Sequence, residues 1–313
     1  MKIKSFFRLV EIQTKIASLF PFVFATVFSL YRYGHLNRMN LGLMFVSLLF
    51  FDMTTTAINN YMDYKKAVDR EYRDHHNIIG IDSIPEYTVR ITIFLMLGIA
   101  VAAGILLTLQ AGWIVLILGI ISFFVGIFYT FGPIPISRMP LGEILSGFMM
   151  GFVIVYLSVY IHFPHMAVLS IQEGQLFLRL DLWETFSIAL VSVPFVLVIS
   201  NLMLANNICD LEQDIKNDRF LLPYYVGVKN ALLIFRFSYY GAYLFIIVSV
   251  VLQILPWFSL LSLLSFPVIQ KHIRLFEAKQ IKSETFVLSV KNLTILSGAY
   301  ILALVPGLFI FLT

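Results

Sequence analysis

The fold is decided by residues 91–137, ITIFLMLGIAVAAGILLTLQAGWIVLILGIISFFVGIFYTFGPIPIS, which contain no Asp, Glu, Lys or Arg. About 20 apolar residues form a helix long enough to cross the hydrocarbon core of a bilayer. This stretch is too long for one such helix, and Gln110, Ala111 and Gly112 interrupt its apolar character. It therefore predicts two consecutive membrane-spanning helices.

Similar uncharged stretches occupy much of the remaining chain, at 16–31, 39–51, 144–172, 185–209, 237–270 and 292–313. The second stretch must continue through Asp52 to span a bilayer, and the fifth is divided near Gln253 to Pro256. We expect an all-α, polytopic membrane bundle that forms one domain over residues 1–313. Its nine transmembrane helices are predicted near 16–33, 40–60, 89–109, 112–131, 141–162, 185–207, 229–252, 255–271 and 289–312.

The composition of the 313 residues excludes several classes of protein. Hydrophobic residues make up 59% of the chain and charged residues 13%, whereas soluble domains average roughly 25% charged residues. An ordinary soluble enzyme and a disordered protein are therefore excluded. Cys209 is the single cysteine, which excludes an intrachain disulfide. The basic N-terminus lacks a small-residue cleavage site, so we expect it to be retained.

The basic residues indicate the orientation of the bundle. With a cytoplasmic N-terminus and nine spans, all of the 22 Lys and Arg residues except Arg32, Arg38 and Arg179 fall on the cytoplasmic side. Cytoplasmic loops of membrane proteins carry such an excess of basic residues. The sequence thus predicts a multi-pass protein of the cell membrane, of the bacterial inner or plasma membrane type.

Two acidic segments lie on the predicted cytoplasmic side, at residues 59–80 and 206–219, and both begin with Asn-Asn at a predicted helix end. Asn59 and Asp63 are spaced i, i+4 and share a helix face. Asn207, Asp210 and Asp214 are spaced i, i+3, i+7 and form a second stripe. Asp69 lies six residues after Asp63, so the first helix must have ended or bent before it.

Clustered carboxylates at the mouth of a bundle repel one another and lose hydration. Mg²⁺ relieves both costs, since it binds one or two carboxylates and takes further oxygens from substrate phosphates. Basic side chains for the remaining phosphate oxygens are present nearby: Lys65, Lys66, Arg70, Arg73, Arg138, Lys216 and Arg219. The pattern indicates a lipid diphosphate as ligand, and the alternative is a solvated loop of mixed charge.

These segments resemble motifs of the UbiA superfamily of intramembrane aromatic prenyltransferases. Residues 59–63 (NNYMD) with Asp69 resemble the first aspartate-rich motif, although Asn60 stands where Asp is usual, and residues 210–214 (DLEQD) resemble the second. Residues 129–133 (YTFGP) through Arg138, then 141–143 (LGE), resemble the segment between helices 4 and 5. Residues 11–15 (EIQTK) and the six-residue gap before Asp69 resemble the branch that prenylates 1,4-dihydroxy-2-naphthoate.

The resemblance implies transfer of a polyprenyl group from an allylic diphosphate to an aromatic acceptor, here 1,4-dihydroxy-2-naphthoate, giving demethylmenaquinone. It implies two Mg²⁺ ions that bridge the diphosphate and an active site that faces the cytoplasm. The implied metal ligands and catalytic carboxylates are Asn59, Asp63 and Asp69 for one ion and Asp210 and Asp214 for the other. The remaining implied site residues are Lys66, Arg73, Arg138 and Arg219 for the diphosphate, Asn207 for substrate, Tyr129 for catalysis and Lys15 for the acceptor carboxylate.

Other functions remain open from the sequence. A transporter would fit the intramembrane Asp52 and the repeated Asn-Asn helix ends, but its ionisable residues should spread through the membrane midplane. The aspartate pattern of phosphatidyl-group transferases is not found. Within the superfamily the rival acceptors are 4-hydroxybenzoate, homogentisate, haem and chlorophyllide. The expected partners are the two substrates and the lipid bilayer, without nucleic acid, and the oligomeric state is not predicted.

Overall fold

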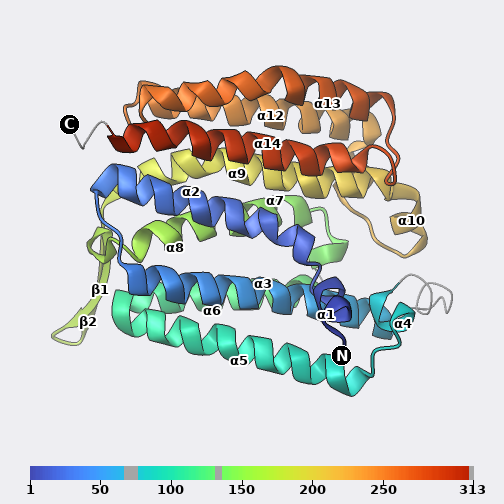
Figure 1. Cartoon of the computed structure of the whole chain (residues 1–313), viewed down its shortest axis with the longest axis horizontal. Coiled ribbons are helices and arrows are strands. Elements are labelled where there is room, and N and C mark those ends of the chain that lie inside the picture. Colours follow the sequence, from blue (N-terminus) through green and yellow to red (C-terminus); the bar gives the residue numbers. More distant parts are fainter. Residues whose placement is uncertain (67–76, 131–135, 310–313) are drawn as a thin grey trace. The chain divides into compact units, whose positions relative to one another are not determined.

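The computed structural model describes residues 1–66, 77–130 and 136–309, and most of these residues are helical (Figure 1). The chain divides into two compact units. Unit 1 comprises residues 1–19 and 38–135, and unit 2 comprises residues 20–37 and 136–313.

The helices of unit 1 are α1 (Ile3–Leu9), the 3₁₀-helix η1 (Ile12–Lys15), α3 (Arg38–Lys66), α4 (Ile78–Ile81), α5 (Glu86–Ala111) and α6 (Trp113–Thr130). Helix α2 (Ile16–Tyr33) begins in unit 1 and belongs to unit 2 from Phe20 onward. The elements of unit 2 are η3 (Ile136–Arg138), α7 (Gly142–Gly147), the π-helix η4 (Phe148–Val153), α8 (Ile154–Tyr160), η5 (Pro164–Met166), β1 (Ala167–Gln172), β2 (Gln175–Leu180), α9 (Leu182–Cys209), α10 (Leu211–Lys216), α11 (Leu222–Val226), α12 (Val228–Val251), η6 (Trp257–Ser265), α13 (Phe266–Ala278), α14 (Phe286–Leu304) and η7 (Val305–Phe309).

The predicted polytopic helical architecture is confirmed in its main feature. Within the described residues, seven helical segments are long and apolar enough to cross a membrane: Ile12–Tyr33, Arg38–Lys65, Glu86–Ala111, Gly142–Tyr160, Leu182–Cys209, Val228–Val251 and Phe286–Phe309. The apolar helix Trp113–Phe128 is shorter. The predicted helix at 255–271 is instead a 3₁₀-helix, η6, that continues into α13. The full number of nine spans stays a prediction.

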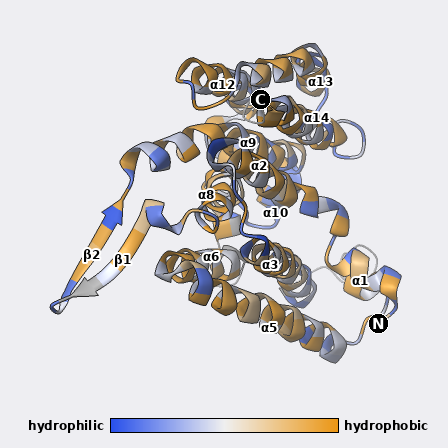
Figure 2. Cartoon of the chain, turned by 60° about the vertical axis from the view of Figure 1, so that its left-hand side comes forward, coloured by the Kyte–Doolittle hydropathy of each residue, from blue (hydrophilic) through white to orange (hydrophobic). Residues whose placement is uncertain are grey.

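In unit 1, α3 packs along α5, and α5 packs against α6 (Figure 1). Apolar side chains from α1, α3, α4 and α5 form its core, among them Leu9, Met53, Ile79 and Val89. The outer side of α5 is also apolar, with Phe94 and similar side chains exposed, and Figure 2 colours its ribbon mostly as hydrophobic. A helix that is apolar on its exposed side is typical of a membrane span.

In unit 2, α9 is the central helix, and it packs against α7, η4, α12 and α14. The rings of Phe24 from α2, Phe195 from α9 and Tyr300 from α14 pack together in its core, with centroids 4.4–5.6 Å apart. Gly147 and Gly151 lie where a Cβ would collide with Val196 of α9. The absence of a side chain at these two glycines therefore allows α7 and η4 to pack closely on α9.

Two local features of the otherwise helical chain were not predicted, one inside the predicted helix at 141–162 and one directly after it. Residues 141–162 contain a π-helical turn, η4, between α7 and α8. Strands β1 and β2 form an antiparallel hairpin, in which Ala167 pairs with Leu180 and Gln172 with Gln175 (Figure 1). Glu173 and Gly174 both have positive φ and form the two-residue turn, the loop length of the commonest hairpins.

Candidate functional site

The first acidic segment begins on α3 in unit 1. Asn59 and Asp63 both lie in this one helix, so the predicted i, i+4 relation holds. Asp52 and Thr56 lie on the same face, closer to the middle of the helix. Asn59 is half-buried and Asp63 is exposed. The stripe therefore runs from the interior of the span to the solvent-exposed end of α3.

Asn60, where the resembled motif usually has Asp, ties the N-terminal segment to α3. Its Nδ2 donates to the Leu9 carbonyl oxygen over 2.9 Å and to Glu11 Oε1 over 3.2 Å. The Asn77 side chain in turn donates to the Asn60 carbonyl oxygen over 2.9 Å. An ionised Asp has no hydrogen to donate at this position, and it would repel Glu11. The amide at residue 60 thus has a structural explanation.

Lys15 is 2% exposed and is held by α3. Its Nζ donates to Asp52 Oδ1 over 2.6 Å, to Thr56 Oγ1 over 2.6 Å and to the Asp52 carbonyl oxygen over 3.2 Å. Ser18 Oγ donates to the other oxygen of Asp52 over 2.5 Å. The three hydrogens of the ammonium match three acceptors. The carboxylate of an aromatic prenyl acceptor could bind Lys15 only by replacing one of these three hydrogen bonds.

The second acidic segment lies in unit 2, where α9 ends at Cys209 and α10 begins at Leu211. The backbone N–H of Asp210 donates to the Asn206 carbonyl over 3.0 Å, and that of Asp214 donates to the Asp210 carbonyl over 2.8 Å. Helix α9 ends at the boundary with Asp210, whose φ of −98° and ψ of 4° are not helical, and α10 begins directly after it. Asn207 and Asp210 therefore share one face of the end of α9, whereas Asp214 lies in the next helix, and the full stripe of three residues stays a prediction.

Each of the two aspartates in this segment has a basic partner. Asp210 forms an ion pair with Lys282, which lies between α13 and α14. Asp214 lies 3.4 Å from an Arg219 guanidinium nitrogen, and only 9% of its side chain is exposed. Burial raises the pKa of the Asp214 carboxyl, the charge of Asp210 raises it further, and Arg219 and Lys282 lower it. The chain thus holds two interacting carboxylates at the end of a buried helix.

Asn207 is 4% exposed and donates from Nδ2 to Oε1 of Glu143 over 2.8 Å. Glu143 comes from α7 and is 2% exposed, and its second oxygen, Oε2, is buried without a hydrogen-bond partner among the described residues. Burial of a carboxylate with an unpaired oxygen costs free energy. Such an arrangement points to a role beyond packing.

For the other predicted site residues, the structure gives the helix in which each lies or leaves the residue outside the described ranges. Lys66 is the last residue of α3, Tyr129 lies in α6, and Arg138 is exposed at the end of η3. Asp69 and Arg73 lie outside the described residues. Prediction from sequence missed Glu143 and Lys282 as neighbours of the second segment. Glu143 did carry a signal, because it is the sole acidic residue between Glu86 and Glu173.

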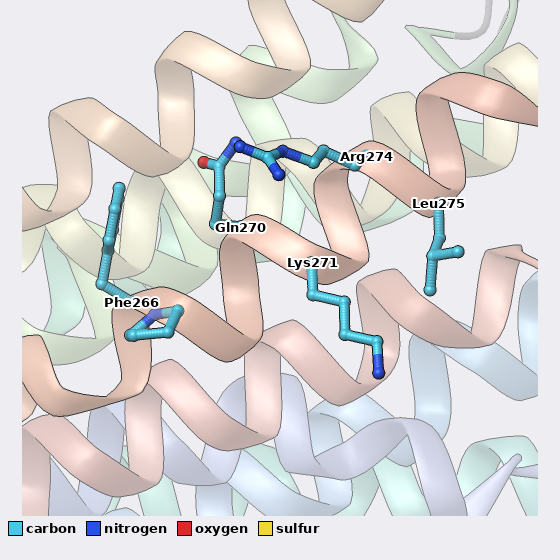
Figure 3. A pocket seen from close by; sticks show the side chains of 6 residues that line it. Phe266, Gln270, Lys271, Arg274 and Leu275 are labelled. Atoms are coloured by element: carbon cyan, nitrogen blue, oxygen red, sulfur yellow. The ribbon is translucent and has the colours of Figure 1, made fainter.

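Two hollows of the surface lie in unit 2. One, of about 610 Å³, is lined by the second acidic segment, including Asp210, Glu212 and Lys216, and by Gln280. The other, of about 530 Å³, lies along α13 alone, where Gln270 and Arg274 approach each other and Lys271 points away from them (Figure 3). The first hollow places open space directly beside the Asp210 carboxylate, and the second lies along one helix.

The donor atoms of unit 2 fit a Mg²⁺ ion. No group of three or more His, Cys, Asp or Glu side chains gathers as a metal cage in the part of the chain that the structure describes. Mg²⁺ does not require one, since it commonly binds one or two carboxylates and completes its shell with waters and substrate phosphates. The charges of Asp210 and Asp214 repel each other, Asp210 lines the open hollow, and a divalent cation bound there would relieve that repulsion.

Comparisons with known proteins bear on the family and the fold of the chain. The UbiA prenyltransferase family matches residues 18–310. The chain is 28% identical to the 1,4-dihydroxy-2-naphthoate octaprenyltransferase of Bacillus subtilis (strain 168) over 240 residues, which cover 75% of this chain and 70% of the relative. This match confirms the resemblance that the sequence motifs suggested.

Two solved structures share the fold at low sequence identity. One, of digeranylgeranylglyceryl phosphate synthase in membranes, has a TM-score of 0.65 and 16% identity, and the alignment covers 98% of each chain. The other, of a UbiA homologue from Archaeoglobus fulgidus bound to DMAPP and Mg²⁺, has a TM-score of 0.65 and 12% identity, with 98% of this chain and 99% of that chain covered. The family match spans nearly the whole sequence, and the chain therefore belongs to the UbiA prenyltransferase family.

Proposed function

We propose that this prenyltransferase transfers a polyprenyl group from an allylic diphosphate to 1,4-dihydroxy-2-naphthoate, in a reaction that requires Mg²⁺. The acceptor loses its carboxylate and gains the prenyl chain, which gives a quinol of the demethylmenaquinone type, and diphosphate leaves. The naphthoate octaprenyltransferase of Bacillus subtilis supports the acceptor. The Archaeoglobus fulgidus homologue, bound to DMAPP and Mg²⁺, supports the donor class and the metal.

The observation that carries the proposal is the open hollow at the end of α9, which Asp210 lines, together with the carboxylate of Asp214, which is near in the sequence and interacts with that of Asp210. In the proposal Asp210 and Asp214 hold one Mg²⁺, and Asn59, Asp63 and Asp69 hold a second. Bound Mg²⁺ stabilises the negative charge that develops on a departing diphosphate. Asn207 lies one helical turn before Asp210 and contacts the substrate.

Basic side chains hold the diphosphate oxygens that the carboxylate sites leave uncovered. We assign this role to Lys66, Arg73, Arg138 and Arg219. Arg219 already lies beside Asp214, so it reaches the same phosphate group. Tyr129 contacts the reacting centre, and Lys15 binds the acceptor carboxylate at the expense of one present bond. The apolar helices around the site keep water from the reactive prenyl cation.

The proposed site lies on the cytoplasmic side of a cell membrane. The excess of basic residues on the predicted cytoplasmic side supports this orientation. A cytoplasmic site receives both a water-soluble naphthoate and a diphosphate headgroup from the same side. The prenyl tail then lies among the apolar helices.

The test of the proposed function is a competition between acceptors. Detergent-purified protein is incubated with Mg²⁺, a polyprenyl diphosphate, and equal amounts of 1,4-dihydroxy-2-naphthoate and 4-hydroxybenzoate, and the products are identified by mass. Asp210→Asn and a chelator serve as negative controls. Asp218→Asn is the matched control, because Asp218 is an exposed carboxylate of the same segment. Its positive φ of 56° is one that Asn tolerates.

We expect a prenylated naphthoquinol from the wild type and from Asp218→Asn, and none from Asp210→Asn or in the presence of chelator. Prenylated hydroxybenzoate alone would overturn the acceptor and keep the reaction class. Equal product from Asp210→Asn would contradict the assigned role of the second segment. Transport of an ion without product would contradict the whole proposal.

A further inference from the structure

Glu143 and Asn207 connect α7 to the end of α9 through a buried hydrogen bond. Asn207 Nδ2 donates to Glu143 Oε1 over 2.8 Å, and both residues are at most 4% exposed. A hydrogen bond between two buried side chains fixes the rotamers of both. The Asn207 amide is therefore held in one orientation.

The close packing of α7 on α9 makes this bond rigid. Glu143, Gly147 and Gly151 are spaced i, i+4, i+8 along α7 and η4. A Cβ at Gly147 or Gly151 would overlap Val196 of α9, so the two backbones are in close contact. Glu143 extends the same face by one turn toward the acidic segment. The backbone of Glu143 therefore cannot move away from Asn207 unless the two tightly packed helices separate.

A side-chain amide carries its donor nitrogen and its acceptor oxygen on the same carbon, in one plane and pointing in different directions. Since Nδ2 of Asn207 is bonded to Glu143, its Oδ1 points away from Glu143. Asn207 precedes Asp210 by three residues at the end of α9, where the Asp210 N–H still donates to the Asn206 carbonyl oxygen. The fixed amide therefore lies on the same helix face as the Asp210 carboxylate.

We propose that Glu143 is a positioning residue, which orients the Asn207 amide so that its oxygen serves the metal and diphosphate site. This inference rests on the proposed function of the second acidic segment and adds a residue to it. Residues that orient metal-binding groups typically change metal affinity or activity about 10–100-fold when they are removed.

The test uses full-length protein in detergent with Mn²⁺ alone as the probe. Binding is measured by the loss of free Mn²⁺ signal in electron paramagnetic resonance, without substrate. Glu143→Met removes the acceptor and keeps the volume, whereas Glu143→Gln retains a carbonyl oxygen that can accept from Asn207. Asn201→Leu is the matched control, because Asn201 also lies buried on α9 and donates to the Phe235 carbonyl over 2.7 Å.

We expect Glu143→Met to weaken Mn²⁺ binding about tenfold or more. Glu143→Gln should bind within about threefold of the wild type, since its hydrogen bond is retained. Asn201→Leu should lower the melting temperature and leave Mn²⁺ affinity unchanged. In an Asn207→Leu background, Glu143→Met should have no further effect on Mn²⁺ binding.

A lower melting temperature with unchanged Mn²⁺ affinity in Glu143→Met would overturn the inference, because packing alone would then explain the residue. Full additivity of Glu143→Met and Asn207→Leu would also overturn it. Asp210→Asn separates this inference from the proposed function. If Glu143→Met and Asp210→Asn both bind Mn²⁺ like the wild type, the metal role of the whole segment is wrong. If Asp210→Asn loses Mn²⁺ binding and Glu143→Met does not, only the role of Glu143 is rejected.

Discussion

Lys15 and Asp52 form a buried ion pair, in which Lys15 Nζ donates to Asp52 Oδ1 over 2.6 Å. The ammonium is nearly inaccessible, and Thr56 and the Asp52 carbonyl satisfy its other hydrogens. Asp52 precedes Asn59 by seven residues, which is about two turns of the same helix face. The pair therefore joins the N-terminal segment to the helix that carries the first acidic segment.

Loss of one partner of this pair should strongly destabilise the protein. Breaking a buried ion pair from one side costs about 3–5 kcal/mol, because the remaining charge stays buried. We expect Lys15→Met to lower the melting temperature in detergent markedly, and Lys15→Met with Asp52→Leu to recover part of the loss. Lys65→Met is the control, since its pair with Glu86 is half-exposed. A Lys15→Met protein as stable as Lys65→Met would contradict this role.

Asp214 should make stability depend on pH in the direction opposite to that of most carboxylates. Burial raises the pKa of the Asp214 carboxyl above the ordinary value of 3.8. Between the ordinary pKa and the raised pKa, the folded chain therefore binds more protons than the unfolded chain. Stability then falls as pH rises from about 4 to the raised pKa and is constant above it. The melting temperature of the wild type, minus that of Asp214→Asn, should therefore decrease with rising pH in chelator-containing buffer. An increase in this difference would show that Arg219 dominates burial.

Lys282 should compete with a metal ion for Asp210. The ion pair places its ammonium on a carboxylate that the proposed site needs, and an exposed pair of this kind contributes only about 0–1 kcal/mol to stability. We expect Lys282→Met to bind Mn²⁺ more tightly than the wild type, with little change in melting temperature. Lys279→Met is the matched control, because Lys279 pairs with Glu284 in the same connection. Equal affinities of the two variants would reject the competition.

Gly151 should not tolerate a side chain. An added Cβ would overlap the backbone of Val196 in α9, and overpacking of this kind costs typically about 1–3 kcal/mol. We expect Gly151→Ala to lower the melting temperature. Gly98→Ala in α5 should leave it unchanged or raise it, because a Cβ there meets nothing within 4 Å and Ala favours a helix over Gly by about 0.5–1 kcal/mol. Equal effects of the two substitutions would contradict the close approach of η4 and α9.

The helical spans were predictable because charge-free stretches of about 20 residues have one stable arrangement in a bilayer. The predicted helix ended at residue 162, but the β-hairpin after it was not predicted from the uncharged residues 167–172. These residues continue the apolar stretch that begins at Ile144, yet they form strand β1. The helix had already ended near Tyr160, and Glu173-Gly174 provides a hairpin turn. The lack of charge alone did not distinguish these two structures.

The placement of Asn59 and Asp63 in one helix was also predictable, since a spacing of four residues defines a helix face. The partners of the second acidic segment were not predictable. Glu143 and Lys282 lie 64 and 72 residues from the side chains that they contact, and no local spacing relates residues at such separations. Asn60 shows a further limit. Asn60 stands where the motif usually has an Asp, and the sequence alone gives no reason for the exchange. Its hydrogen bonds to Leu9 and Glu11 show that the amide holds the N-terminal segment.

The central claim is that Asp210 and Asp214 serve a metal-dependent prenyl transfer. The most direct measurement is the initial rate of diphosphate release as a function of Mg²⁺ concentration, with polyprenyl diphosphate and 1,4-dihydroxy-2-naphthoate present, for the wild type, Asp210→Asn, Asp214→Asn and Asp218→Asn. We predict saturable Mg²⁺ dependence in the wild type and Asp218→Asn, and rates at least about 100-fold lower in the other two variants. Release that is independent of Mg²⁺, or equal in all four proteins, would contradict the claim.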